Sequence, residues 1–199
     1  NDTILEERTY SDDPDTVARY AGAVAAGNSQ AGIMPGMKHW PGIGGSDTDP
    51  HASLPVLASI EELRAQDLRA FTPLLESDPV AVMVAHAEIP GLTDEGEPAS
   101  LSRKAISDEL RGTEGFDGLV ITDSLGMGAV VNQMTQAEAA ERAISAGADI
   151  ALLSGADVVA DAHEQLVGAI TEGRIPAEQV EESVRRVLDA KGIEGECFD

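Results

Sequence analysis

The chain has 199 residues, of which 42% are hydrophobic, so it can form one domain with a sizeable core and is not disordered by composition. Its net charge of −23 argues against nucleic acid and anionic membranes as partners, since both bind basic surfaces, and it favours solubility or a salty setting. The single cysteine, Cys197, excludes an intrachain disulfide and a thiolate metal cluster, and no apolar run reaches membrane-spanning length.

Four short apolar runs along the chain predict four β-strands. They cover residues 32–39, 79–86, 118–123 and 148–154, and they show no sequence repeat. The second run is apolar at both alternating sets of positions, which is typical of a parallel strand that is buried on both faces.

The segments between these runs carry apolar residues at helical spacing. Helices are expected at 13–27, 59–74 and 102–110, from 135 onwards, and at 157–172 and 176–190. Several of them begin at a residue that can cap a helix, in two cases with a glutamate three residues later as in a capping box. The predicted caps are Asp13, Ser59, Ser102 and Thr135.

This alternation of strand and helix predicts a parallel α/β fold. Three of the predicted strands end at His39, His86 and Asp123, and functional groups at strand ends are typical of the (β/α)₈, or TIM, barrel. An open doubly wound sheet is the alternative, but no glycine fingerprint follows a strand and opens a helix. Because four βα units fall short of eight, and barrels usually need about 250 residues, we expect only half of a barrel.

The glycine- and proline-rich loop from Lys38 to Pro55 holds the most informative pair, Asp49 and His51. An aspartate two residues from a histidine can orient the imidazole as an acid/base near neutral pH. In the alternative interpretation, Asp49 only makes an Asx turn before Pro50.

Residues 38–51 resemble the signature of glycoside hydrolase family 3 in its bacterial β-N-acetylhexosaminidase branch, where Lys-His-Phe-Pro-Gly-His-Gly precedes Asp-Ser-His. This chain has Lys-His-Trp-Pro-Gly-Ile-Gly and Asp-Pro-His in the same register, and further matches follow at 82–86, 98–102 and 115–129. The likeness runs from Arg8 to about Leu188. The family fold is a (β/α)₈ barrel, so residues 1–199 are expected to form the C-terminal half of its catalytic domain. The chain does not begin with methionine, and it should need the N-terminal half-barrel or self-association.

The resemblance implies a retaining exo-β-N-acetylhexosaminidase that hydrolyses terminal N-acetylglucosamine from cell-wall-derived glycans, in the bacterial cytoplasm or cell envelope. By that analogy Asp123 is the nucleophile that forms a glycosyl-enzyme, and His51 is the general acid/base with Asp49 orienting it. In the alternative interpretation Asp123 only caps the helix after its strand. The alternative functions are a phosphorolytic β-glycosidase, a non-catalytic carbohydrate-binding relative and an inactive fragment.

By the same analogy, Arg8, Lys38 and His39 hold the sugar hydroxyls and the acetamido group. Arg8 could instead be a solvated loop charge, and Lys38 could pair with an acidic neighbour. Alternation places Lys38 and His39 on opposite faces of a regular strand, so both can face the sugar only where the strand ends or bulges.

The sequence departs from the family pattern at Ile43, where the family often has histidine, and at Pro50, which replaces serine. No metal or cofactor is expected, because the histidines are scattered and no acidic triplet has calcium-loop spacing. Two histidines are interpreted as structural, His86 as a packed strand end and His163 as a surface residue. Trp40, Met83 and Met127 are predicted to form core or pocket wall.

Overall fold

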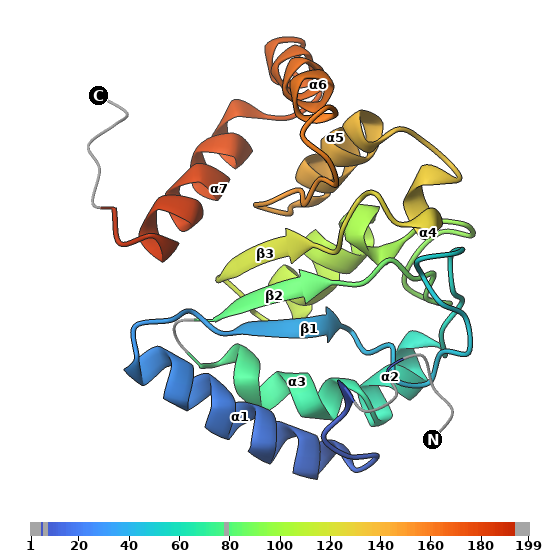
Figure 1. Ribbon diagram of the computed structural model, residues 1–199, viewed down its shortest axis with the longest axis vertical. Helices are drawn as coiled ribbons and strands as arrows, with labels where there is room; N and C mark the ends of the chain where they lie inside the picture. Colours follow the sequence, from blue (N-terminus) through green and yellow to red (C-terminus); the bar gives the residue numbers. More distant parts are fainter. Residues whose placement is uncertain (1–4, 6–7, 78–79, 194–199) are drawn as a thin grey trace.

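The computed structural model describes residue 5 and residues 8–77 and 80–193, and this part of the chain alternates between strands and helices (Figure 1). The strands are β1 (Gly36–Trp40), β2 (Ala81–Val84) and β3 (Leu119–Thr122). The α-helices are α1 (Pro14–Gln30), α2 (Ile60–Ala65), α3 (Leu68–Leu75), α4 (Gly128–Val131), α5 (Gln136–Ala146), α6 (Val159–Thr171) and α7 (Ala177–Ala190). A 3₁₀ turn, η2 (Ala99–Leu101), and a π-helix, η3 (Lys104–Thr113), lie between β2 and β3.

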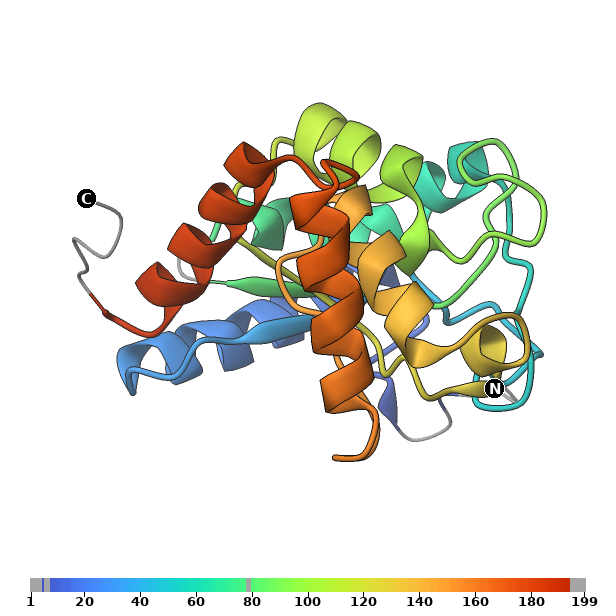
Figure 2. The same cartoon turned by 90° about the horizontal axis from the view of Figure 1, so that it is seen from above.

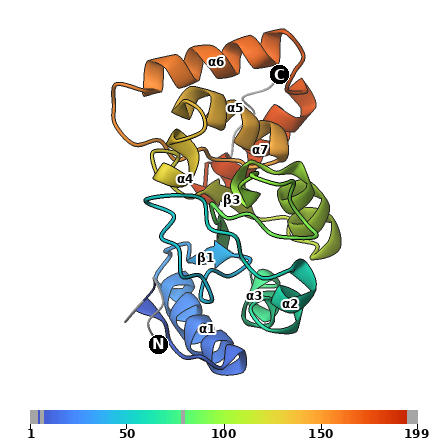
Figure 3. The same cartoon turned by 90° about the vertical axis from the view of Figure 1, so that its right-hand side faces the viewer.

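The three strands form a parallel sheet in the order β1-β2-β3, which confirms the predicted parallel α/β pairing. Gly36 lies opposite Ala81, which lies opposite Leu119. Figure 3 looks along the strands and shows α1 to α3, η3 and α5 to α7 in an arc around the sheet. Figure 2 shows α6 and α7 in front of the strands. Because each strand returns through helix, all three carboxyl ends meet at the same edge.

The predicted fourth strand, residues 148–154, is not a strand in the described structure. It lies beside β3 and forms one isolated parallel bridge, between Ile121 and Ile150. Backbone bonds still join it to β3, since the Thr122 N–H donates to the Ile150 carbonyl (3.0 Å) and the Asp149 and Ile150 N–H groups both donate to the Val120 carbonyl (2.8 and 3.1 Å). Side chains add two further bonds. The Val120 N–H donates to the carboxylate of Asp149 (2.8 Å), and the Leu152 N–H donates to the hydroxyl of Thr122 (3.0 Å). These side-chain bonds interrupt the regular backbone pattern that defines a strand.

Three of the four predicted helix caps are confirmed. The Asp13 carboxylate accepts the Thr16 N–H at 3.0 Å, and Ser59 and Thr135 each form the predicted capping box. Ser102 does not cap, because its hydroxyl is buried without a partner in the described residues and η2 precedes η3 there. The helix expected at 59–74 is also divided, with α2 ending at Ala65 and α3 beginning at Leu68.

The core lies between the sheet and the helices. Val82, Val84 and Val120 have no exposed surface, whereas Met83 and Ile121, on the other set of positions, are half-buried. The prediction that β2 is buried on both faces therefore holds fully for one face only. Burying each of the valines Val82, Val84 and Val120 stabilises the fold by roughly 1.5–3 kcal/mol, so the strands hold the residues at their carboxyl ends in fixed positions.

Candidate active site

The carboxyl edge of the sheet brings His39 and Asp123 together. His39 Nε2 lies 3.4 Å from Asp123 Oδ2, and the two side chains are 10% and 17% exposed. The other carboxylate oxygen, Oδ1, accepts the Ser124 N–H at 2.7 Å. The carboxylate is thus held from both sides while part of it remains accessible at the strand end.

Asp123 is not the helix cap that the alternative interpretation required. The next helix, α4, begins at Gly128, and Met127 occupies its N-cap position. Four residues therefore separate the carboxylate from the helix. A side chain that caps no helix and sits at the end of a buried strand is a functional candidate.

Lys38 and His39 are both at this edge because β1 is irregular there. The pairing of β1 with β2 shifts register between Lys38 and Trp40, which confirms that the strand bulges at this point. The peptide bonds Lys38–His39 and Trp40–Pro41 are cis. Lys38 is exposed, and among the described residues no carboxylate lies within ion-pair distance of it.

The charges of Arg8 and Lys38 reach His39. Burial is the main cause that lowers the pKa of His39, the negative charge of Asp123 opposes it, and the positive charges of Lys38 and Arg8 lower the pKa further. Lys38 and Arg8 are therefore close enough to His39 for their charges to act on it, and His39 itself contacts Asp123.

Asp49 and His51 form the predicted pair. His51 Nδ1 lies 2.8 Å from Asp49 Oδ1, and the same oxygen accepts the His51 backbone N–H at 2.9 Å. The backbone bond from His51 is the largest cause that lowers the pKa of Asp49, followed by the imidazole bond. The Asx turn and the oriented imidazole therefore coexist. Because a carboxylate oxygen only accepts, Nδ1 carries a proton and Nε2 is available for acid/base chemistry.

The loop that carries His51 is attached to the chain that follows Asp123. The Gly128 N–H donates to the His51 carbonyl and the Ala129 N–H to the Pro50 carbonyl, both at 3.0 Å. No hydrogen bond or ion pair joins the side chains of His51 and Asp123 in the part of the chain that the structure describes. Movement of this glycine-rich loop to bring His51 to a bound sugar stays a prediction.

The two departures from the family pattern are buried. Ile43 is 5% exposed and belongs to the hydrophobic core, and Pro50 is also buried. Trp40 and Met127 are buried and Met83 is half-buried, as the core or wall interpretation predicts. His163 is exposed on α6, as predicted.

Gly42 fixes the loop against the start of α3, and its replacement has a clear expected effect. Its φ is +127°, and an added Cβ would lie 2.5 Å from the Asp67 Cβ. Gly42→Ala should therefore lower the free energy of unfolding by about 1–3 kcal/mol, measured by urea denaturation. Gly45→Ala is the matched control, since nothing lies within 4 Å of its added Cβ. Equal stability of the two variants would contradict this close approach.

His86 is packed, as predicted. It is 1% exposed, its Nδ1 lies 2.6 Å from Ser100 Oγ, and its Nε2 lies 2.9 Å from the Ser124 carbonyl oxygen. On the other side of the same turn, the hydroxyls of Ser124 and Ser154 are hydrogen-bonded. Ser100 and Ser124 lie in the segments 98–102 and 115–129 that resemble the family, but neither was given a role, and Ser154 was not singled out, because a serine carries no periodic or spacing signal that shows its partner.

The buried histidines predict how stability depends on pH. Burial is the largest cause that lowers the pKa of both His39 and His86 from 6.5. Below pH 6.5 the unfolded chain therefore binds more protons than the folded one, so stability falls as the pH falls. Each histidine contributes at most about 1.4 kcal/mol per pH unit.

We expect the free energy of unfolding to fall between pH 7.5 and 5.5, with a shallower slope in His86→Phe and an unchanged slope in His163→Gln. Urea titrations in 1 M salt should measure it, because salt screens the repulsion among surface carboxylates. The same slope in His86→Phe and in the unaltered protein would contradict the assignment.

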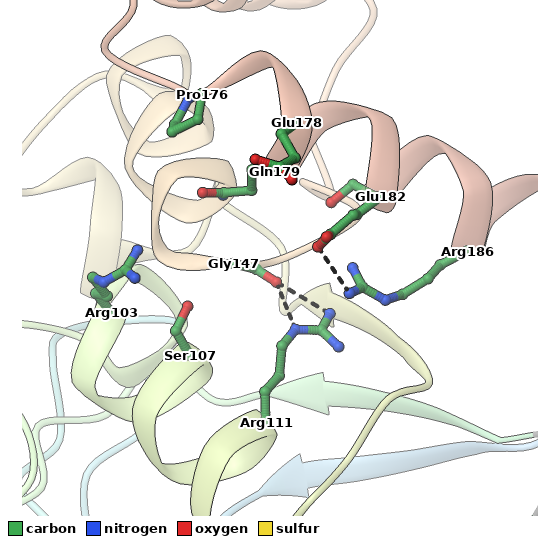
Figure 4. A pocket seen from close by; sticks show the side chains of 10 residues that line it. Arg103, Ser107, Arg111, Gly147, Pro176, Glu178, Gln179, Glu182 and Arg186 are labelled. Atoms are coloured by element: carbon green, nitrogen blue, oxygen red, sulfur yellow. Dashed lines mark hydrogen bonds and ion pairs between the residues drawn. The ribbon is translucent and has the colours of Figure 1, made fainter. Parts of the chain in front are cut away.

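A pocket of about 270 Å³ lies at the opposite end of the sheet, between η3, α7 and Gly147 (Figure 4). Arg111 donates to the Gly147 carbonyl and to Asp149 Oδ2 (2.7 Å), and Arg186 donates to Asp149 Oδ1 (2.9 Å). Both guanidinium groups are therefore paired with one buried carboxylate. They cross-link the amino end of the sheet to its helices, away from the strand ends that carry Asp123.

Two further observations bear on cofactors and membranes. Across residues 8–77 and 80–193, no group of three or more His, Cys, Asp or Glu side chains is placed to hold a metal ion. None of the helices that the structure describes is both long and apolar enough to cross a membrane.

A parallel sheet with polar residues at the carboxyl ends of its strands places the chain among barrel-type and doubly wound α/β proteins. The family described as glycosyl hydrolase family 3 N terminal domain matches residues 1–190. The β-hexosaminidase LpqI of Mycobacterium tuberculosis (strain ATCC 25618 / H37Rv) is 39% identical over 202 residues, covering 99% of this chain and 52% of LpqI. A solved structure of LpqI superposes with a TM-score of 0.92 over 98% of this chain and 58% of that one, at 39% identity.

Two other solved structures are also similar. The family 3 β-N-acetylglucosaminidase from Paenibacillus sp. str. FPU-7 has a TM-score of 0.89 and 33% identity, over 96% of this chain and 38% of that one. The β-glucoside phosphorylase BglX bound to 2FGlc has a TM-score of 0.85 and 28% identity, over 94% and 35%. The chain therefore belongs to glycosyl hydrolase family 3, as the sequence motifs indicated. It spans about half the length of the curated relatives it matches.

Proposed function

We propose that this chain is the C-terminal half of a (β/α)₈ catalytic barrel, and that the protein is a retaining exo-β-N-acetylhexosaminidase. Three parallel strands, helices in an arc around them, and a match to about half the length of its relatives support the barrel. The β-hexosaminidase and β-N-acetylglucosaminidase relatives support the activity. The substrate would be a glycan ending in N-acetylglucosamine, derived from the cell wall.

In the first step, Asp123 attacks the anomeric carbon, and the bond to the leaving oxygen breaks while His51 gives that oxygen a proton from Nε2. The product is a glycosyl-enzyme ester. In the second step, neutral His51 takes a proton from water, and the resulting hydroxide equivalent displaces Asp123 from the sugar. Asp49 holds the Nδ1 proton throughout and stabilises the imidazolium that forms in each cycle.

Arg8, Lys38 and His39 would hold the sugar. The cationic groups of Arg8 and Lys38 and the N–H of the His39 imidazole can donate to hydroxyl and amide oxygens, and both charges act on His39, which contacts Asp123. His39 also contacts the carboxylate directly, so it would keep the nucleophile in place while the sugar binds. The two residues that depart from the family pattern would affect the site in different ways. Ile43 packs into the core, and Pro50 would stiffen the loop that must carry His51 to the bound sugar.

The observation that carries the proposal is the partly exposed Asp123 carboxylate, held by His39 and the Ser124 N–H at the strand ends. The test is hydrolysis of an aryl N-acetyl-β-glucosaminide by the protein as its gene encodes it, with the matching aryl β-glucoside as the comparison. A slow fluorinated sugar should then label the peptide that contains Asp123. Label on another carboxylate would refute the assignment, and sugar binding without turnover would favour a non-catalytic relative.

Phosphorolysis is a second candidate, supported by the imidazole in the acid/base position and by the similarity to a β-glucoside phosphorylase. A neutral base does not repel an incoming phosphate as a carboxylate would. Adding phosphate to the assay should then yield a sugar 1-phosphate. A product that remains the free sugar at high phosphate would leave hydrolysis as the activity.

A further inference from the structure

Two buried polar side chains next to Asp123 have no part in the proposed mechanism. His86 is 1% exposed and the Ser100 side chain lies fully inside. Burying an imidazole is costly unless its two nitrogens are hydrogen-bonded, so its partners indicate what holds it there.

Ser100 is fixed beside His86 by the backbone. The Ser100 N–H donates to the Ala85 carbonyl (3.1 Å), and the Ala99 N–H donates to the Ala87 carbonyl (2.8 Å). These bonds attach η2 to the chain just after β2, on both sides of His86. The Ser100 hydroxyl is consequently placed 2.6 Å from His86 Nδ1.

The partners of His86 determine its tautomer. Nε2 faces the Ser124 carbonyl oxygen at 2.9 Å, and a carbonyl only accepts, so Nε2 carries the proton. Burial lowers the pKa of His86, which keeps the ring neutral and leaves Nδ1 to accept from the Ser100 hydroxyl. The ring is therefore a fixed donor aimed at one backbone carbonyl.

That carbonyl belongs to the residue whose N–H holds the carboxylate. The Ser124 N–H donates to Asp123 Oδ1 at 2.7 Å. The backbone on both sides of Ser124 is anchored, since the Asp123 N–H donates to the Val84 carbonyl (3.1 Å) and the Leu125 N–H, in the same peptide unit as the Ser124 carbonyl, donates to the Leu152 carbonyl (2.8 Å). The Ser124 carbonyl itself accepts from the Met127 N–H (3.0 Å) and from His86, so His86 is the side chain that holds Ser124 on the carbonyl side of its Cα.

We propose that His86, oriented by Ser100, is a positioning residue for the nucleophile: by holding the Ser124 carbonyl it fixes the conformation of Ser124, whose N–H, on the other side of the same Cα, aims the Asp123 carboxylate at the sugar. The inference rests on the proposed role of Asp123. It concerns residues that do not touch substrate, and it predicts an effect on the chemical step rather than on sugar binding.

The test uses His86→Phe, His86→Gln and Ser100→Ala in the protein as its gene encodes it. His163→Phe, on the exposed face of α6, is the matched control. His86→Phe should lower kcat for an aryl N-acetyl-β-glucosaminide roughly 10- to 100-fold with little change in KM. His86→Gln should recover part of that loss, because its amide N–H can donate to the same carbonyl, and Ser100→Ala should lose a few-fold.

Nuclear magnetic resonance supplies a second readout that does not need turnover. The unaltered protein should show the Nε2–H tautomer at His86, and the amide proton of Ser124 should move upfield in His86→Phe as its bond to the carboxylate loosens. Unchanged kcat in His86→Phe, or no recovery in His86→Gln while KM rises, would overturn the proposal. If the unaltered protein hydrolyses no glycoside, the proposed function fails, and the Ser124 signal alone decides whether His86 orients Asp123.

Discussion

Replacing Asp123 with alanine is expected to lower kcat by roughly 10⁴-fold or more while leaving the fold intact. Removing a nucleophile removes the covalent route altogether, and the residual rate comes from binding and electrostatics alone. The fold should persist because the carboxylate faces the strand-end edge, caps no helix and is partly exposed. The measurement is the steady-state rate on an aryl N-acetyl-β-glucosaminide, with thermal unfolding of the same sample.

The control for Asp123→Ala is Asp189→Ala, an exposed carboxylate on α7 whose loss should leave kcat unchanged. The two variants remove the same charge from a chain whose net charge is −23, so a general charge effect would appear in both. Full activity in Asp123→Ala would refute the nucleophile assignment and the mechanism built on it.

Replacing His51 with alanine is expected to have an effect that depends on the leaving group. A positioned acid/base contributes about 10²- to 10⁴-fold, so the rate on a disaccharide should fall by that factor. An activated aryl leaving group needs no proton, so its departure should be nearly unimpaired and a glycosyl-enzyme should accumulate. Burst kinetics on the aryl substrate would reveal this accumulation.

Asp49→Asn tests the pair of Asp49 and His51 with a smaller change, because it leaves the imidazole in place. The amide can still accept through its oxygen, but it cannot stabilise the imidazolium by charge, so a smaller loss than in His51→Ala is expected. His163→Ala is the control, because this histidine is exposed on α6. Equal rates of His51→Ala and the unaltered protein on a disaccharide would remove His51 from the mechanism.

Features that depend on neighbours in sequence were predictable. Asp13, Ser59 and Thr135 cap their helices because each cap needs only a side chain and an N–H within three residues. The contact between Asp49 and His51 spans two residues and was likewise predicted from spacing.

The lack of a helix cap at Ser102 and the break between α2 and α3 at Gln66 were not predicted. The helical period of the sequence does not reveal that the Ser102 hydroxyl is buried and has no hydrogen-bond partner among the residues that the structure describes. Two helical segments with a compatible period also read as one when the turn between them lacks glycine or proline.

By itself, the sequence determined the parallel α/β class, three of the four strands predicted from it, the contact between Asp49 and His51 and the family, because these follow from periodicity, spacing and motif order. Only the tertiary structure decided that Asp123 faces His39, that His86 and Ser100 support the turn after it, and that residues 148–154 bond to β3 through side chains as well as through backbone. The physical reason is that sheet order and register bring together strand ends far apart in the chain. Which donor then meets which carboxylate depends on that packing and not on local spacing.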